Sequence, residues 1–208
     1  TIISKRSNNS TFGTLSAPHS HMYTNPNIEA ALPDLLEILP EARVVTGEKT
    51  DRFSKDFYWY SPVLKELLED KRADVALLVK SKEELKSVVS LLYKNDIPLT
   101  IRGGGSGNYG QLVPLYGGAV IDLTKMDTIF SVDGVVHCEV GATLRKIEIE
   151  AREQGWELRC MPSTWVISTI GGFLCGGSGG IGSILHGGIA TGDNVKSVTI
   201  MTMEEEPK

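Results

Sequence analysis

Glycine is concentrated in two segments of this 208-residue chain. The first, IRGGGSGNYGQ over residues 101–111, holds five glycines in eleven positions. The second, STIGGFLCGGSGGIGSILHGG over residues 168–188, has nine glycines in the 18 positions from Gly171 to Gly188. Because glycine has no Cβ atom, such segments allow backbone N–H groups to converge on an anion at close range. Together they could hold a long, doubly charged ligand such as the pyrophosphate of a dinucleotide.

Hydroxyl and amide side chains add donors to both segments. These side chains are Ser106, Asn108, Tyr109, Ser168, Thr169 and Ser178. An alternative is that the glycines serve only tight turns and bulges. Two such segments, separated by an intact stretch of strands and helix, favour a shared ligand over that alternative.

Two common nucleotide-binding motifs are excluded. A Walker loop needs a Gly-Lys pair, and the chain contains none. A Rossmann fingerprint must open a helix, but the first glycine segment is followed by QLVPLYGGAVIDL, whose Pro114 and Gly117 disfavour a helix and whose apolar end predicts a strand. A pyrophosphate would therefore rest on loop amides and not on a helix N-terminus.

The elements before residue 103 predict a strand–helix–strand unit. Residues 28–39 have a helical pattern with Pro33 near its start, residues 42–47 form a short strand candidate, and Ser61 caps a helix that begins at Pro62. A buried strand at 74–80, a helix capped by a Ser81–Glu84 capping box, and a strand at 97–101 then predict a βαβ unit with a parallel pair. The first glycine segment follows its second strand, where ligands of parallel α/β sheets bind.

The elements after the first glycine segment are shorter. AVIDL, TIFSVDG and VVHCEVG, over residues 119–141, predict antiparallel strands. TLRKIEIEAREQG predicts a helix that ends at Gly155, and residues 194–208 form a last strand candidate with an acidic end. Residues 1–28, rich in Ser, Thr and Asn, are expected to form a flexible tail.

Composition and charge argue against several classes of function. The net charge of −5 gives no basic surface for nucleic acid, and no apolar stretch approaches the ~18 residues of a membrane span. Three cysteines, Cys138, Cys160 and Cys175, indicate a reducing compartment and no disulfide framework. We therefore expect an intracellular protein, cytoplasmic or mitochondrial, without a metal site.

The order of these pieces resembles the FAD-binding (PCMH-type) domain of the vanillyl-alcohol oxidase and p-cresol methylhydroxylase flavoprotein superfamily. The resemblance covers about residues 40–203 and is carried by DVALLVKSKEELKSVVSLLYKNDIPLTIRGGGSGNYGQ, GGAVIDLTKMDTI, CEVGATLRKI and MPSTWVISTIGGFLCGGSGGIG. It implies a two-lobed α+β fold with a small βαβ lobe, residues 40–103, and a larger, mostly antiparallel lobe, residues 104–208.

The resemblance also implies FAD as cofactor and names its contacts. The first glycine segment would wrap the pyrophosphate, and the second would line the pyrophosphate and the isoalloxazine edge. The expected FAD-binding residues are Arg102, Gly103, Gly104, Gly105, Ser106, Gly107, Asn108, Tyr109, Gln111, Pro162, Ser163, Thr164, Thr169, Gly171, Gly172, Gly176, Gly179 and Gly180. Arg102 could instead pair with a nearby acid and brace the loop.

FAD is expected to bind without a covalent link. Some relatives attach FAD through a His directly after the three-glycine run, where this chain has Ser106. Others use a Cys immediately before a Pro, but here Met161 separates Cys160 from Pro162. Cys160 is expected to be buried and inert, and His186 to be structural.

The implied function is transfer of a hydride from an alcohol or 2-hydroxy acid to FAD, with an electron acceptor that the sequence does not identify. The resemblance also implies a substrate-binding cap domain that supplies the catalytic base, and this domain is expected to lie outside residues 1–208, so this stretch alone is expected to be inactive. Two alternatives stay open: a non-catalytic nucleotide-binding or structural domain, and an enzyme of the same superfamily with another reaction, such as an enolpyruvyl-sugar reductase or an ether-lipid synthase.

Overall fold

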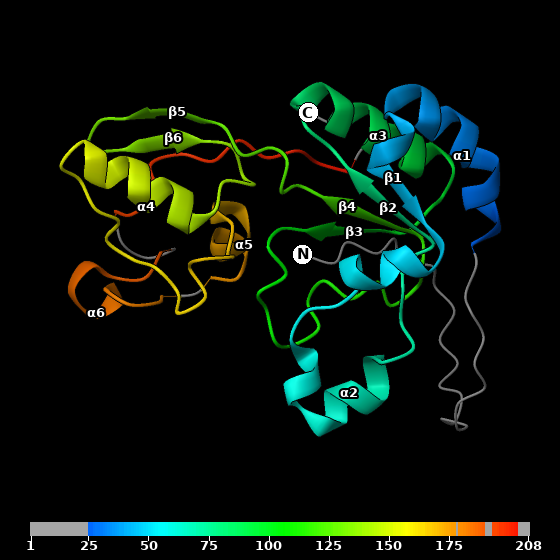
Figure 1. The fold of residues 1–208 in the computed structure, drawn as a ribbon, viewed down its shortest axis with the longest axis horizontal. Coiled ribbons are helices and arrows are strands. Elements are labelled where there is room, and N and C mark those ends of the chain that lie inside the picture. Colours follow the sequence, from blue (N-terminus) through cyan, green and yellow to red (C-terminus); the bar gives the residue numbers. More distant parts are fainter. Residues whose placement is uncertain (1–24, 178, 190–192, 204–208) are drawn as a thin grey trace.

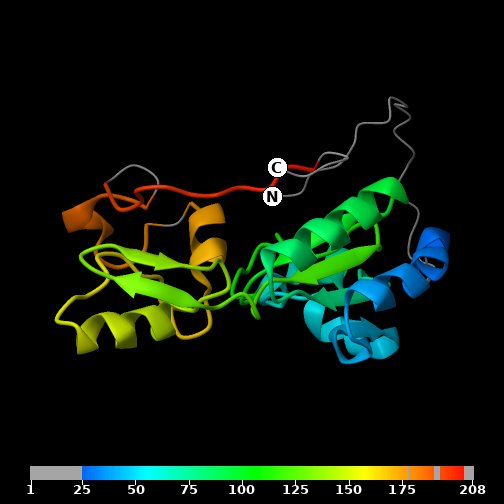
Figure 2. The same ribbon diagram turned by 90° about the horizontal axis from the view of Figure 1, so that it is seen from above.

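The computed structural model describes residues 25–177, 179–189 and 193–203. These residues form two lobes that lie side by side (Figures 1 and 2). The first lobe is built on a four-stranded sheet and the second on a two-stranded sheet, each with helices beside it. The predicted α+β class and the two-lobed architecture are confirmed.

The first lobe holds a mixed sheet with the strand order β1-β2-β4-β3. Strand β1 is antiparallel to β2, whereas β4 pairs in parallel with both β2 and β3. Its elements are α1 (Pro26–Ile38), η1 (Glu41–Arg43), β1 (Val44–Thr46), η2 (Gly47–Phe53), η3 (Tyr58–Tyr60), α2 (Pro62–Leu68), β2 (Val75–Leu78), α3 (Lys82–Lys94), β3 (Leu99–Arg102) and β4 (Ala119–Asp122).

Strand β4 corrects two of the sequence-based expectations. It was expected to be antiparallel and to lie in residues 104–208 as part of the second lobe, but it lies in the first sheet between β2 and β3. The strands of the predicted βαβ unit are therefore parallel but are not neighbours. The four buried residues of β4 explain this position, since a strand covered on both faces belongs in the centre of a parallel sheet.

Alternate residues of the central strands fill two cores. Leu77 and Ile121 are fully buried in the core that the sheet forms with α1 and α3. Ala76 and Val120 point to the opposite face and pack with Phe53 of η2. Cover on both faces holds the carboxyl ends of β3 and β4 in place.

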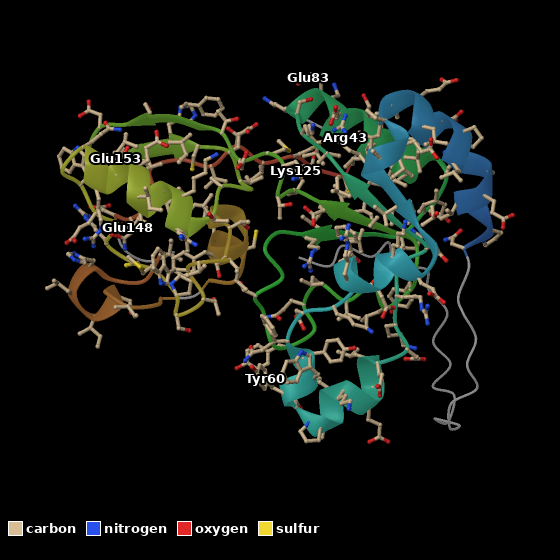
Figure 3. The ribbon with its side chains drawn as sticks, in the orientation of Figure 1. Arg43, Tyr60, Glu83, Lys125, Glu148 and Glu153 are labelled. Atoms are coloured by element: carbon tan, nitrogen blue, oxygen red, sulfur yellow. The ribbon has the colours of Figure 1, made fainter. Side chains whose placement is uncertain are left out.

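The helix caps of this lobe mostly follow the sequence. Ser61 accepts a hydrogen bond from the Leu64 N–H, and Ser81 accepts one from the Glu84 N–H. Helix α1, however, begins at Pro26, because Asn25 caps it, so it starts inside the range expected to be a tail. The apolar residues of α2 are not buried, and Tyr60 on the adjacent η3 is 68% exposed (Figure 3).

The second lobe contains β5 (Ile129–Val132), β6 (Val136–Cys138), α4 (Leu144–Glu153), α5 (Ile170–Cys175) and α6 (Ser183–His186). Strands β5 and β6 are antiparallel, as predicted. Helix α4 is capped by Thr143, and Gly155 follows its end with a positive φ of 81°, which confirms the predicted stop.

The last described stretch, residues 193–203, forms no strand and so differs from the expectation for 194–208. Val198 and Ile200 are exposed. Met201 and Met203 instead pack against the core of the first lobe. The segment therefore passes from the second lobe to the first (Figure 2).

Candidate cofactor-binding site

The first glycine segment is part of the crossover between two parallel strands. Residues 103–118 leave the carboxyl end of β3 and return to the start of β4, its direct neighbour in the sheet. Such crossovers usually contain a helix, but this one has none. The crossover therefore keeps an irregular backbone, and some of its N–H groups are not used by regular secondary structure.

Six consecutive backbone donors stand at the start of the crossover. Within the described part of the chain, no acceptor receives the N–H groups of residues 103–108. The next two N–H groups are paired: that of Tyr109 with the Gln111 side chain and that of Gly110 with Asp56. A run of unpaired amides, of which those of residues 103–107 belong to partly buried residues, is the donor set that an anion such as pyrophosphate requires.

The second glycine segment is attached to the second lobe at its beginning and near its middle. Thr169 caps α5 by accepting a hydrogen bond from the Gly172 N–H, and Gly171 donates to the Val140 carbonyl. Met161 and Ile181 exchange two backbone hydrogen bonds of 3.1 and 2.7 Å. The Pro162 turn therefore lies beside Gly180, although the two are far apart in sequence.

The two segments touch through side-chain hydroxyl groups. The oxygen atoms of Ser106 and Ser168 are 2.7 Å apart, and those of Thr164 and Ser168 are 2.8 Å apart. A Cβ atom on Gly103 would collide with the Thr169 hydroxyl, and one on Gly104 would collide with the Ile167 carbonyl. These two glycines are therefore required for the close approach of the two loops.

The predicted site residues are not all alike in their surroundings. Gly171 must lack a side chain, because a Cβ atom there would press on Val140, whereas Gly176 is the C-cap of α5. Gly180 has a φ of 67° and packs against the Met161 carbonyl. Tyr109 is exposed. Ser178 lies outside the described residues.

Arg102 supports the backbone of the first glycine segment. Its guanidinium lies 3.4 Å from the Asp122 carboxylate, and it donates a hydrogen bond to the Lys55 carbonyl at 3.2 Å. Parallel pairing sets Arg102 opposite Asp122 at the ends of β3 and β4. A Cβ atom on Gly105 would meet this guanidinium, so the arginine supports the loop backbone. Burial lowers the pKa of Arg102, while Asp122 and Asp56 oppose that shift.

Asp56 is a site residue that the sequence analysis missed. The residue is only 5% exposed, and its carboxylate accepts the N–H groups of Tyr58 at 2.8 Å and Gly110 at 3.0 Å. Burial raises the pKa of Asp56, opposed by these N–H groups and by the Arg102 charge. No sequence pattern near Asp56 signals this role, because its partner in the glycine segment, Gly110, lies 54 residues away along the chain.

The other reactive side chains of the second segment lie apart from this arrangement. Cys160 is buried and donates its S–H to the Gly187 carbonyl at 3.4 Å, which agrees with the expected inert role. Cys175 and His186 are exposed. Over the described ranges, no group of three His, Cys, Asp or Glu residues could hold a metal ion, and no helix could cross a membrane.

A family model described as an FAD binding domain matches residues 73–206, which include both glycine segments and the contact between them. The chain belongs to this FAD-binding domain family. The resemblance to PCMH-type domains stated from the sequence is thereby confirmed, and the protein is related to flavin-dependent oxidoreductases.

Curated relatives of this FAD-binding domain include two enzymes named for D-2-hydroxy acids. D-lactate dehydrogenase of Anaerostipes hadrus is 30% identical over 168 residues, which are 79% of this chain and 33% of that enzyme. The probable mitochondrial D-2-hydroxyglutarate dehydrogenase of Oryza sativa subsp. indica is 27% identical over 56% of this chain and 22% of its own length. The chain thus spans a third or less of these relatives.

Solved structures show the same fold. An alkyldihydroxyacetonephosphate synthase superimposes with a TM-score of 0.69 at 22% identity, over 78% of this chain and 34% of that one. A p-cresol methylhydroxylase superimposes with a TM-score of 0.57 at 16% identity, over 71% and 29% of the two chains. Both comparisons support the PCMH-type fold.

The residues present suit FAD. The six unpaired N–H groups of residues 103–108 offer donors for phosphate oxygens, and the hydroxyl groups of Ser106, Thr164 and Ser168 lie next to them. The donor set contains no charged side chain, because Arg102 is engaged with Asp122 under the loop. Backbone dipoles and hydroxyl groups would therefore carry the recognition of the pyrophosphate.

Proposed function

We propose that this domain belongs to an FAD-dependent oxidoreductase that oxidises an alcohol or a 2-hydroxy acid. The main support is the contact between the two glycine segments, which places six free N–H groups beside three hydroxyl groups. The choice of a 2-hydroxy acid rests on the two relatives named as dehydrogenases of D-lactate and D-2-hydroxyglutarate.

In this proposal FAD supplies the hydride acceptor, and the chain supplies binding and orientation. Residues 103–108 would hold the pyrophosphate, and Pro162, Ser163 and Thr164 with the turn from Thr169 to Gly172 would line the adjoining part of the cofactor. The hydroxyl groups of Ser106 and Ser168 already meet at this place. The remaining predicted contacts, from Gly176 to Gly180, would complete the second wall.

We also propose that residues 1–208 bind FAD without oxidising a substrate. Hydride transfer needs a positioned base and a donor carbon held in near-attack geometry. In the described part of the second glycine segment, the one imidazole is that of His186, which is exposed on α6. The chain spans only a third of its relative from Anaerostipes hadrus, so catalytic groups of the whole protein are expected elsewhere.

The test begins with apoprotein titrated with FAD, followed by quenching of flavin fluorescence. Saturable binding supports the cofactor assignment, and absence of binding would favour a domain that has kept the fold without the flavin. The longest available form of the protein, loaded with FAD, is then mixed without oxygen with D-lactate, D-2-hydroxyglutarate or their L-enantiomers. Bleaching of the flavin by a D-enantiomer alone is the expected result.

A second candidate function is supported by a specific observation. An alkyldihydroxyacetonephosphate synthase of Dictyostelium discoideum is 28% identical over 68% of this chain, and a synthase of that name has the TM-score of 0.69. If FAD binds but none of the 2-hydroxy acids bleaches it, synthesis of an alkyldihydroxyacetone phosphate becomes the reaction to test. Formation of an alkyl ether would then replace the dehydrogenase proposal.

A further inference from the structure

The buried carboxylate of Asp56 accepts hydrogen bonds from the middle of the crossover that carries the first glycine segment. One oxygen of Asp56 accepts the N–H of Tyr58, and the other accepts the N–H of Gly110. The Gln111 N–H also donates to Asp56. The Phe57 N–H donates to the Gly107 carbonyl at 2.8 Å. Asp56 and Phe57 are therefore joined to residues 107–111.

Asp56 contacts the crossover just after its run of unpaired N–H groups, residues 103–108, comes to an end. The N–H groups of residues 103–108 have no acceptor in the part of the chain that the structure describes, whereas those of Gly110 and Gln111 both donate to Asp56. Asp56 thus divides the crossover into an open half and an anchored half. Anchoring one half restricts the directions that the amides of the other half can take.

The chemistry of this anchor requires a carboxylate. Both of its oxygens accept N–H groups, so an asparagine at this position would turn one NH2 group toward a backbone donor. The negative charge of Asp56 lies near a proposed dianion site and would oppose binding by itself. Burial raises the pKa of Asp56, and the positive charge of Arg102, which opposes that rise, offsets part of the repulsion.

We propose that Asp56 is the positioning residue of the FAD-binding loop. Its carboxylate holds residues 103–108 in the arrangement that receives the pyrophosphate. The inference rests on the proposed function, because it assigns a role in binding FAD. It adds a residue outside both glycine segments to the cofactor site. It also explains why a charged group is buried beneath a loop that itself carries no charged side chain.

The structure offers a control, because the Asp74 carboxylate accepts a hydrogen bond at the other end of the same crossover. One oxygen of Asp74 accepts the Gly118 N–H at 2.7 Å and the Asn25 N–H at 3.1 Å. Gly118 directly precedes β4, at the end of the sheet opposite the free amides. Asp74→Asn therefore removes a carboxylate that also accepts two backbone N–H groups, although through a single oxygen, and leaves the proposed binding half untouched.

The first test compares FAD affinity in Asp56→Asn and Asp74→Asn, measured by fluorescence titration of the apoprotein. Asp56→Asn is expected to weaken FAD binding about 10- to 100-fold, because hydrogen bonds to a charged group are lost and a buried donor is left unpaired. Asp74→Asn is expected to leave the dissociation constant within about two-fold of wild type. Equal losses in the two variants would show that Asp56 only supports the fold, and would overturn the proposal.

The second test uses only the wild-type protein, so it does not depend on whether a variant folds. Hydrogen exchange in the wild-type apoprotein should be slow at Gly110 and Gln111 and fast at Gly103–Gly107, and addition of FAD should slow only the latter group. Fast exchange at Gly110 before FAD is added would overturn the proposed anchor, whatever the affinity data show. If the apoprotein shows the expected exchange pattern but binds no FAD, the cofactor assignment fails and the positioning role fails with it, although the anchor itself is present.

Discussion

The hydroxyl oxygens of Ser106 and Ser168 lie 2.7 Å apart, although 62 residues separate them in the chain. This contact joins a loop of the first lobe to a loop of the second. Ser168 is 4% exposed and also shares a hydrogen bond with Thr164. It is therefore the central member of a chain of three hydroxyl groups.

Removal of the central hydroxyl should cost more stability than removal of an outer one. Ser168→Ala is expected to lower the free energy of unfolding by about 1–3 kcal/mol, because both neighbours lose a partner, and Ser106→Ala by about 1 kcal/mol. In the double variant the two losses should fall short of additivity by about 0.5 kcal/mol or more. Urea unfolding measures all three values.

Ser163→Ala is the control for this cycle, since Ser163 is exposed and lies in the same turn. It should change the free energy of unfolding by less than about 0.5 kcal/mol. Fully additive losses for Ser106 and Ser168 would show that their hydroxyl groups do not interact in solution.

A single methyl group at Gly104 should damage the cofactor site. The Cβ atom of Gly104→Ala would collide with the Ile167 carbonyl and force the two loops apart, with valine having a larger effect. We expect FAD affinity to fall at least about 10-fold, since the hydroxyl contact and the amide arrangement would both be disturbed. Fluorescence titration measures the affinity, and circular dichroism checks the fold.

Gly155→Ala provides the comparison for Gly104. No atom lies within 4 Å of a Cβ placed there, but its φ is positive, so alanine should cost about 1 kcal/mol of stability and leave FAD binding unchanged. Unaltered FAD affinity in a folded Gly104→Ala protein would remove the support for close loop approach as a requirement of binding.

FAD should leave the protein on acid denaturation. Ser106 occupies the position at which a linking His is found in some relatives, and its oxygen is engaged with Ser168. Cys160 is buried and bonded to the Gly187 carbonyl. After precipitation of the FAD-loaded protein with acid, flavin absorbance is expected in the supernatant. Flavin retained in the washed pellet would instead demand a covalent link.

The Arg43–Glu84 pair should make stability depend on acidic pH. Arg43 donates to both oxygens of Glu84, at 2.6 and 2.7 Å. The hydrogen bond from Arg43 lowers the pKa of Glu84 below the ordinary 4.5. Because the folded-state pKa is depressed, the stabilisation is complete above pH 4.5 and is lost as pH falls through the lower folded value.

Glu84→Gln should therefore cost about 1–3 kcal/mol at neutral pH, and its difference from wild type should shrink below pH 4.5. Glu83→Gln is the matched control, because Glu83 is exposed on the same first turn of α3 (Figure 3). Urea unfolding between neutral and acidic pH measures both. A constant difference between Glu84→Gln and wild type at all pH values would contradict the assignment.

Local features of the fold could be read from the sequence. Ser81 and Thr143 cap helices within three residues of the N–H groups that they accept, and Gly155 ends α4 with the left-handed backbone that glycine favours. Each signal lies close to the element that it defines. The two glycine segments were found in the same way.

The position of β4 required information that short patterns do not provide. The run from Ala119 to Asp122 was expected in an antiparallel sheet because short strands and turns follow it closely. A signal against that interpretation was present, since neither β2 nor β4 alternates apolar and polar residues. Continuous apolar runs are typical of strands buried on both faces of a parallel sheet.

The site was only partly predictable for a similar reason. The glycine segments are visible as composition, but Asp56 lies 54 residues from Gly110 and has no distinctive neighbours. Arg102 was weighed as a phosphate ligand or a brace, and only the parallel register of β3 and β4 sets it against Asp122. Contacts of this kind depend on strand order, and the sequence analysis had assigned β4 to the wrong sheet.

The place of β4 between β2 and β3 has a consequence for the order of folding during synthesis. Strand β3 leaves the ribosome before β4, yet β4 is its one partner in the described sheet. Until Asp122 emerges, β3 has no strand to pair with, and the edge of β2 is open as well. A nascent chain that ends before β4 should therefore expose an unpaired β3 and one open edge of β2, while completion of β4 would close the sheet and order the glycine crossover in a single step.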